Sequence, residues 1–561
     1  MKYILVSLLI TQLSFSQVEY PQNYFRSPLD ITLVLSGTFA ELRTNHFHSG
    51  LDIKTQQKVG KNVYTAAEGY VSRIKIQHYG YGKALYVTHP NGYTTVYGHL
   101  QSFSPKIEAY IKAKQYEKES YEIEVFPSAS DLAVSKDEII AYSGNTGGSG
   151  GPHLHFEIRD NEERPINPLL FGINVNDSKS PLISAVFAYP KDENSYINGK
   201  NNRTELRLIP SKGNEYTVEN IEAIGKIGFG VVAYDQQDLA NNYNGVYNIQ
   251  TFFNGNKKFE MDFFRFSFDE SRHINRFLDY EYYKAKRSRI QKLFVEKDNP
   301  LSMYKNLDEN GYITIENGTS SVYKVKISDF KGNESWINIH IDGNQPKAIL
   351  KKPENKKNYY VFANQATNLK DKNVSVYFAP NSFYDDTFID FKVSNDTIYL
   401  DEDKIPLQKN VSLQYDISNY KESDKDRLFI AELLGYKKYP SYLSTKRKDN
   451  TLSAYSNALG TYALVLDTTN PTITPTNFKD GKWISNYRYL TLKISDDLSG
   501  ISNYRATVNG KWILMEYEYK NGSLTFDFND NVITDTKNEL KLVVTDNVGN
   551  SSTFEATFFR K

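Results

Sequence analysis

The sequence predicts a mainly β protein, in which an N-terminal domain of short strands is followed by tandem β-sandwich modules. In the first part, short segments alternate apolar with polar residues, and Pro-Asn-Gly at 90–92 is typical of a hairpin turn. Further along, the pattern Asp-x-x-x-Pro starts at Asp177, Asp342 and Asp467, and each copy precedes a new run of short strands. Short strands at regular spacing with such turns indicate β-sandwiches in tandem.

Length and composition restrict the class of protein. A chain of 561 residues suggests three to five domains, at roughly 100–200 residues each. Lys+Arg and Asp+Glu both number 67, so the overall charge does not favour nucleic acid or an anionic surface as a partner. Cysteine is absent, which excludes disulfides and leaves His and carboxylates as ligands for any metal site.

The N-terminal segment MKYILVSLLITQLSFS (1–16) predicts a secretory signal peptide. One basic residue precedes an apolar run, and the small residues Ser14 and Ser16 precede the expected cut at Gln17. The run is shorter than the roughly 20 residues of a membrane span, and no later run is long enough. No cysteine follows the cut, which excludes a lipid anchor there. We therefore expect an exported, soluble protein, periplasmic or extracellular, with no transmembrane segment.

The region 107–133 is rich in Lys, Glu and Tyr and interrupts the strand pattern, which predicts an inserted helix or lid.

Four domains are expected after the signal peptide. VKISDFKGN at 325–333 and LVVTDNVGN at 542–550 match each other near module ends, and VVAYDQQDLAN at 231–241 resembles a looser copy. The first module is overlong, which predicts an insertion around 280–294. The expected boundaries are 17–173 for the N-terminal domain and 174–343, 344–467 and 468–561 for the modules, the last of them Ig-like.

Seven of the nine histidines lie within residues 17–173, although this region is under a third of the chain. Two of them, His153 and His155, stand two apart in a β-prone run, so both side chains project from one face of a strand. The glycine-rich lead-in at 144–151 leaves room for a ligand in front of the rings. Alone, these features suggest a metal site or, equally, a pair of structural histidines.

A larger group of side chains leads to a chemical hypothesis. Catalytic zinc takes three protein N or O ligands and leaves a position for water, whose pKa falls to roughly 7. The sequence lacks HExxH, so a histidine would have to act as the base. Three ligands and two proton-handling groups could come from His48, Asp52, His99, His153 and His155.

Three ordered motifs carry a resemblance to a known family. HxGxD at 48–52, YGHL at 97–100 and GPHLHFEIR at 151–159 resemble the lysostaphin/LytM-type zinc endopeptidases, which cut peptidoglycan peptides. The resemblance covers roughly residues 45–167 and implies a compact antiparallel β-sheet with a groove above it. The insertion at 107–133 departs from the family pattern and affects the expected groove shape, and with it the substrate preference.

The resemblance also implies a role for each site residue. The Zn²⁺ ligands would be His48, Asp52 and His155, and the catalytic histidines would be His99 and His153.

The other histidines have simpler interpretations. His46 is a rival ligand, but it lacks the spacing to the aspartate that the motif has. His78 and His89 are expected on strand surfaces or lining the groove. His273 and His340 lie in the modules and are expected to be structural.

The sequence thus predicts an exported zinc metalloendopeptidase that hydrolyses peptide bonds of peptidoglycan stems or cross-links. Its partner would be the peptide part of the wall, with a further protein partner possible through the C-terminal modules. The alternative is a non-catalytic adaptor of the same fold that binds the wall or activates an enzyme. All five site positions are filled, which favours the enzyme. An enzyme acting on a non-wall protein is a third alternative.

Overall fold

The computed structural model describes residues 20–346 and 357–561, and strands make up most of its regular structure. The predicted mainly β class is therefore confirmed. The expected signal peptide, 1–16, lies outside the described residues. Within the described ranges, no helix has both the length and the apolar character needed to cross a membrane.

The N-terminal β-domain (residues 20–173) contains two antiparallel sheets. The larger has the order β1 (Leu35–Gly37), β2 (Leu51–Lys54), β11 (His153–Arg159), β6 (Thr94–Gly98), β5 (Lys83–Thr88), β4 (Gly69–Ile76) and β8 (Ile123–Val125). Two short strands extend it, β12 (Pro165–Ile166) beside β11 and β9 (Ala133–Val134) beside β4. The smaller sheet has the order β3 (Asn62–Tyr64), β10 (Ile139–Ser143) and β7 (Leu100–Phe103). This antiparallel arrangement is the one that the resemblance implies.

Strand β11 lies between β2 and β6 and has two chemically different faces. Leu154 and Phe156 are fully buried in the core, and the residues that alternate with them point the other way. That other face carries His153 and His155, and the register places His155 directly opposite Asp52 of β2. Directly opposite side chains are close neighbours in an antiparallel sheet. The pairing of β2 with β11 therefore brings these two donors together.

The segment predicted as an insertion forms helix α1 (Pro105–Lys118) and then strand β8. Pro105 takes the start of the helix, where its missing N–H has no intrahelical partner to lose. Ile107 and Ile111 are buried and join the core of the N-terminal β-domain. Strand β8 then pairs with β4 at the edge of the sheet. The segment is thus built into the fold.

The second unit (strands β13–β25, residues 182–343) is one connected 13-stranded sheet. Strand β18 (Ile221–Tyr234) links its parts, because it pairs with β13 (Leu182–Pro190) and also runs parallel to β25 (Glu334–Gly343). Helix α3 (Tyr280–Lys286) forms the first part of the predicted insertion, and helix α2 (Ile274–Phe277) precedes it. The remaining strands are β14 (Tyr196–Ile197), β15 (Thr204–Leu206), β16 (Leu208–Pro210), β17 (Glu215–Val218), β19 (Asn248–Phe253), β20 (Asn256–Asp262), β21 (Gln291–Lys292), β22 (Tyr304–Leu307), β23 (Ile313–Ile315) and β24 (Ser320–Ser328).

The third unit (strands β26–β37, residues 359–466) has two five-stranded sheets around its own core. One has the order β27 (Thr367–Asp371), β28 (Val374–Phe378), β32 (Val411–Asp416), β36 (Thr451–Ser456) and β35 (Lys446–Lys448). The other has β30 (Phe391–Ser394), β31 (Thr397–Leu400), β37 (Gly460–Leu466), β33 (Leu428–Leu434) and β34 (Tyr439–Tyr442). Strands β26 (Tyr359–Val361) and β29 (Thr387–Ile389) pair separately, and α4 (Glu422–Lys425) is a single turn.

The fourth unit (strands β38–β46, residues 472–559) also has two sheets around one core. Four strands follow the order β38 (Thr472–Pro475), β40 (Tyr489–Ser495), β44 (Ser523–Asp527) and β43 (Glu516–Glu518). Five follow the order β39 (Lys482–Trp483), β46 (Ser551–Phe559), β45 (Lys537–Asp546), β41 (Ile501–Val508) and β42 (Lys511–Trp512). The third and fourth units therefore each have the layered form of a β-sandwich.

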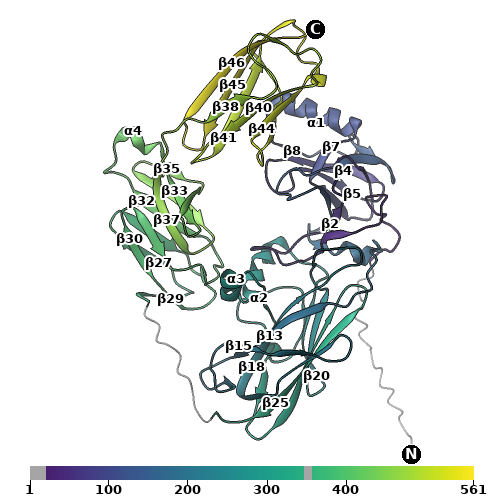
Figure 1. Ribbon diagram of the computed structural model, residues 1–561, viewed down its shortest axis with the longest axis vertical. Helices are drawn as coiled ribbons and strands as arrows, with labels where there is room; N and C mark the ends of the chain where they lie inside the picture. Colours follow the sequence, from purple (N-terminus) through teal and green to yellow (C-terminus); the bar gives the residue numbers. More distant parts are fainter. Residues whose placement is uncertain (1–19, 347–356) are drawn as a thin grey trace, which may run out of the picture.

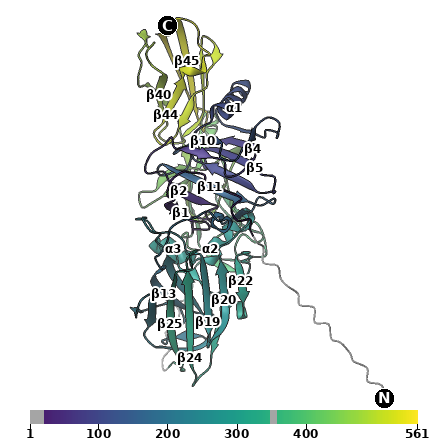
Figure 2. The same ribbon diagram turned by 90° about the vertical axis from the view of Figure 1, so that its right-hand side faces the viewer.

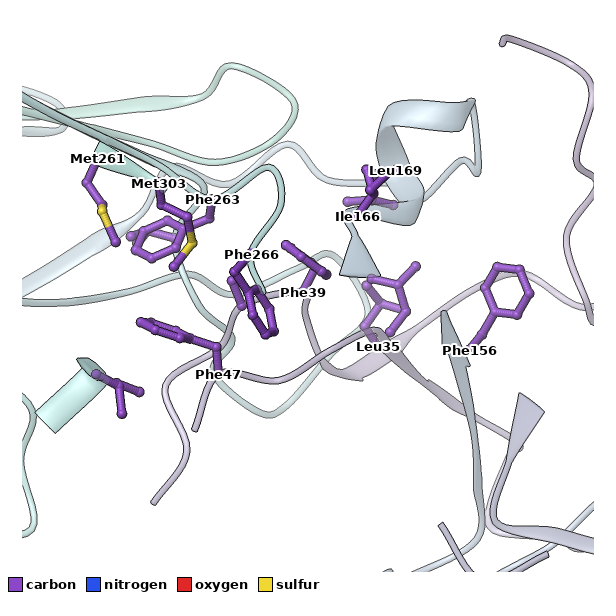
Figure 3. Close-up of a cluster of buried hydrophobic side chains, with 14 of the residues drawn as sticks. Leu35, Phe39, Phe47, Phe156, Ile166, Leu169, Met261, Phe263, Phe266 and Met303 are labelled. Carbon is purple, nitrogen blue, oxygen red and sulfur yellow. The ribbon is translucent and has the colours of Figure 1, made fainter. Parts of the chain in front are cut away.

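The N-terminal β-domain and the second unit share one hydrophobic core. Figure 3 shows Phe39 and Phe47 of the N-terminal β-domain beside Phe266 of the second unit. Their ring centroids lie 5.4 and 5.6 Å from that of Phe266, which is fully buried. The first two parts of the chain are therefore packed as one body.

The chain turns back on itself, so that the fourth unit lies beside α1 (Figures 1 and 2). Lys112 of α1 pairs with Asp530 of the fourth unit at 2.5 Å, and Tyr116 donates its hydroxyl to the same carboxylate at 2.7 Å. The buried Leu514 of the fourth unit joins the core of the N-terminal β-domain. The segment predicted as an insertion thus provides part of the contact surface for the last unit, and Lys83 of β5 adds an ion pair to Glu516 at 2.9 Å.

Candidate active site

Three candidate metal ligands meet where β2 and β11 pair. His48 Nε2 and His155 Nδ1 lie 3.0 and 2.9 Å from Asp52 Oδ1, and 3.1 Å from each other. Gly50 lets the chain approach β11 closely, because a Cβ there would lie 2.3 Å from the Phe156 carbonyl oxygen. One donor atom from each of the three residues lies within 4.8 Å of the others. The fold therefore brings together the three residues that were expected to be ligands.

Hydrogen bonds orient the two imidazole rings of this group. The Nδ1–H of His48 is donated to the carbonyl oxygen of Thr38 at 2.7 Å, which leaves Nε2 facing Asp52. The Nε2–H of His155 is donated to Glu157 Oε1 at 2.7 Å, which leaves Nδ1 facing Asp52. Partners of this kind fix the tautomer of a metal-binding histidine and raise its basicity.

Glu157 was not among the site residues predicted from the sequence. It is fully buried and also accepts hydrogen bonds from Tyr81 Oη at 2.5 Å, Ser49 Oγ at 2.7 Å and Arg159 Nε at 2.6 Å. Burial raises its pKa, but Arg159 and His155 outweigh this and hold the pKa well below the usual range. A signal for it was present, since a residue two positions after His155 shares its face of the strand.

His99 and His153 flank the ligand group, with ring centroids 4.7 Å apart. The Nδ1–H of His99 is donated to the Thr146 carbonyl oxygen at 2.8 Å, and that of His153 to the Gly151 carbonyl oxygen at 2.9 Å. His153 Nε2 lies 3.4 Å from Asp52 Oδ1. In each ring Nδ1 is therefore occupied by a hydrogen bond, which leaves Nε2 to act at the centre of the site.

The chemistry of the donors suits a divalent metal ion. Two imidazole nitrogens and one carboxylate oxygen are the ligand types that zinc takes in catalytic sites, where a fourth position is left open. Burial raises the pKa of Asp52, but His48, His153 and His155 outweigh this and keep the pKa well below the usual range. The carboxylate is therefore ionised, as a metal ligand has to be.

Two family models match parts of this chain. Peptidase family M23 matches residues 46–116 and 127–168, and a Zu5-like domain matches residues 358–467. Residues 46–168 form an M23 peptidase domain. The interval between its two matched stretches, 117–126, falls at the end of α1 and in β8, inside the segment that was predicted as an insertion.

The M23 domain is similar to domains of curated bacterial proteins. DD-carboxypeptidase/endopeptidase Mpg of Neisseria meningitidis is 29% identical over 160 residues, which are 28% of each chain. Peptidoglycan DD-endopeptidase ShyA of Vibrio cholerae is 28% identical over 189 residues, 33% of this chain and 35% of that one. The chain therefore spans about a third of the length of these relatives. Among solved structures, the catalytic domain of lysostaphin from Staphylococcus simulans is 21% identical with a TM-score of 0.18, covering 24% of this chain and 87% of that one.

The site of the M23 domain opens into a cleft of about 760 Å³ with walls from three parts of the chain. The second unit contributes Phe268, Ser271 and Arg272, and the third unit contributes Asn410 and Asn457. Arg272 Nη1 donates to Asn410 Oδ1 at 2.9 Å across the two units. The shape of the cleft therefore depends on residues outside the M23 domain.

The pKa values of His99 and His155 are shifted in opposite directions. Burial and the charges of His155 and His153 lower the pKa of His99 to about 3. Burial also lowers the pKa of His155, but hydrogen bonds to Asp52 and Glu157 outweigh it and raise the pKa to about 9. The His155 ring, which lies between Asp52 and Glu157, thus holds a proton more readily than the ring of His99.

The remaining histidines of the M23 domain lie outside the ligand group. His46 lines the cleft but is not part of the group of three donors. The prediction for His89 was wrong, because it is buried and bonded through Nδ1 to the Glu68 carbonyl oxygen at 2.7 Å. His78 packs against Tyr517 of the fourth unit, with centroids 5.2 Å apart, and so lies at a contact between units.

Proposed function

We propose that this chain is an exported zinc-dependent endopeptidase that hydrolyses peptide bonds of peptidoglycan stems or cross-links. One observation carries the proposal: His48 Nε2, Asp52 Oδ1 and His155 Nδ1 converge, with two further histidines beside them. The match to peptidase family M23 and the name of the ShyA relative support the substrate class. The apolar segment 1–16 supports export.

In this proposal zinc is bound by His48, Asp52 and His155. Bound there, zinc would lower the pKa of a water molecule to about 7 and polarise the carbonyl of the scissile peptide. The two imidazole rings are already turned toward Asp52 by hydrogen bonds to Thr38 and Glu157. Little reorganisation of these side chains is then needed for binding.

His99 and His153 are proposed as the catalytic residues. One of these two histidines accepts a proton from the attacking water, and the other stabilises the oxyanion of the tetrahedral intermediate. Since each Nδ1–H is donated to a backbone carbonyl, only Nε2 can serve these roles. The neutral ring presents a lone pair at Nε2, and the protonated ring presents an N–H donor there.

The rest of the chain is proposed to be non-catalytic. We place the boundaries of the catalytic domain at 17–173 and those of three modules at 174–343, 344–467 and 468–561, with the last module Ig-like. The grouping of the sheets and the Zu5-like match at 358–467 support this division. Modules that hold an enzyme at an insoluble substrate raise the local concentration of cleavable bonds.

Digestion of isolated sacculi tests the proposal. Full-length protein with zinc bound should release peptides with new termini, identified by mass spectrometry. A chelator should abolish release and added zinc should restore it. The zinc-loaded His153→Ala variant serves as the control for contaminating hydrolases. If zinc-loaded protein forms no new termini on sacculi or on soluble stem peptides, the enzymatic proposal fails. Co-sedimentation with sacculi would then test the adaptor alternative.

A further inference from the structure

Three aspartates that are not ligands of the M23 site converge where the chain enters the second unit. Asp177 begins the first Asp-x-x-x-Pro motif, Asp235 directly follows β18, and Asp329 directly follows β24. One carboxylate oxygen from each lies within 4.8 Å of the others. The cluster therefore joins the start of the unit to the ends of two of its strands.

The same arrangement occurs where the chain enters the fourth unit. Asp467 begins the third Asp-x-x-x-Pro motif, Asp496 directly follows β40, and Asp546 ends β45. Their carboxylate oxygens also lie within 4.8 Å of one another. In both units the second aspartate follows the strand that pairs with the first strand of the unit. The cluster is thus built twice at equivalent positions of two modules.

An asparagine holds each cluster together in the same way. Asn333 Nδ2 donates to Asp329 Oδ2 at 2.7 Å and to the carbonyl oxygen of Asp177 at 3.3 Å. Asn550 Nδ2 donates to Asp546 Oδ2 at 2.7 Å and to the carbonyl oxygen of Asp467 at 3.0 Å. These bonds explain why the turn motif Asp-x-x-Gly-Asn occurs in both units together with Asp-x-x-x-Pro.

The middle aspartate of each cluster has an oxygen without a hydrogen-bond partner. Asp235 is 5% exposed, and its buried Oδ1 accepts no hydrogen bond in the described part of the chain. Asp496 is only partly buried as a residue, but its Oδ1 atom is buried and has no donor among the described residues. Leaving a buried carboxylate oxygen unpaired is costly, so such an atom indicates a missing partner. Burial and the charges of Asp177 and Asp329 raise the pKa of Asp235 to about 8, since three like charges converge there.

Both clusters lie where one unit meets the preceding part of the chain. Beside the first, a cavity of about 40 Å³ is lined by Asp177 and Asp235 and also by Leu35 and Phe39 of the N-terminal β-domain. At the second, the backbone N–H of Asp467 is donated to the Arg427 carbonyl oxygen of the third unit at 3.0 Å. A ligand bound at either cluster would connect the beginning of a unit to its body at that junction.

The second Asp-x-x-x-Pro motif provides an internal contrast. Asp342 lies within β25 and, among the described residues, belongs to no group of three candidate ligands. It instead accepts a hydrogen bond from Ser320 Oγ at 3.3 Å. The motif alone therefore does not create a cluster, since two further aspartates from strand ends are needed.

We infer that each of the two clusters binds one Ca²⁺ ion, Asp177, Asp235 and Asp329 holding the first and Asp467, Asp496 and Asp546 holding the second. All six donors are carboxylates, and hard cations take oxygen ligands. Nitrogen donors, which zinc commonly uses, are absent from both groups of ligands. Ca²⁺ accepts irregular carboxylate geometry more readily than Mg²⁺, which demands a near-ideal octahedron. Bound Ca²⁺ stabilises the second and fourth units and stiffens the junctions at which they begin.

The stoichiometry of Ca²⁺ binding tests this inference on the full-length, zinc-loaded protein. Equilibrium dialysis against calcium chloride should give two bound Ca²⁺ per chain. The isosteric variants Asp235→Asn and Asp496→Asn should each lose one of the two, and the double variant should lose both. The matched control Asp342→Asn should keep both. The midpoint of thermal unfolding should rise with Ca²⁺ in the wild type, because the ion binds only the folded chain.

Two results would overturn the inference. The first is wild-type protein that binds no Ca²⁺ at millimolar free concentration, the range typical of weak extracellular sites, or that binds Mg²⁺ alone. The second is a folded double variant with the stoichiometry of the wild type. Circular dichroism is used to determine whether each variant is folded. If one is not, the wild-type stoichiometry together with Asp177→Asn and Asp467→Asn decides the outcome.

Discussion

His155 donates its Nε2–H to Glu157 Oε1 across 2.7 Å, and this bond turns the opposite nitrogen of the ring toward Asp52. Glu157 is itself held by Arg159, with Nε 2.6 Å from Oε2, and both side chains are buried. The orientation of one proposed metal ligand therefore depends on an ion pair deeper in the sheet. This relationship makes Glu157 a positioning residue for the site.

Glu157→Gln should weaken zinc binding by about 10–100-fold, because a neutral amide stabilises the oriented imidazole less than a carboxylate does. Competition with a chelator of known affinity measures the change. Glu163→Gln is the matched control, since Glu163 pairs with Arg159 from an exposed position at 3.0 Å. Unchanged zinc affinity in folded Glu157→Gln would show that the bond does not tune the site.

Asp52→Ala should abolish stoichiometric zinc binding, since it removes the only carboxylate of the proposed ligand set. Elemental analysis of the dialysed protein should find about one zinc per wild-type chain, as a single three-ligand site requires. Asp30→Ala, which removes an exposed aspartate of the same domain, should leave the zinc content unchanged. Full zinc occupancy in Asp52→Ala would refute the assignment.

His99→Ala and His153→Ala should each reduce turnover about a hundredfold or more while zinc remains bound. The rate of hydrolysis of a soluble stem peptide and the zinc content are measured on the same samples. His46→Ala is the control, since His46 lines the same cleft but lies outside the ligand group. A variant of His99 or His153 with near-native turnover would exclude that residue from catalysis.

Phe266→Ala should lower the free energy of unfolding by about 3–5 kcal/mol, the usual cost of removing a buried aromatic ring. The loss should affect the N-terminal β-domain as well as the second unit, because Phe266 packs on Phe39 and Phe47. Urea unfolding followed by hydrogen exchange locates the destabilised regions. Phe126→Ala, at a ring 71% exposed, should change stability by no more than about 0.5 kcal/mol. Destabilisation confined to the second unit would show that the two parts fold independently.

Much of the candidate site could be predicted because its residues stand in short motifs. Strand alternation alone puts His153 and His155 on one face, and the same rule would have added Glu157. The convergence of Asp52 with His155 is different, because these residues are 103 positions apart and meet through the register of β2 with β11. Nothing in the local pattern specifies that register, so only the family resemblance pointed to it.

The sequence by itself determined the β class, the turns and the chemistry-bearing motifs, since these follow from local alternation and from residue types. Only the tertiary structure decided how the parts combine. Phe266 is part of the core of the N-terminal β-domain, Asn410 lines the cleft of the site, and Asp235 joins Asp177 in a shared cluster. Such contacts depend on which apolar surfaces are buried together and which strand ends meet. These are properties of the whole folded chain, and a local pattern does not encode them.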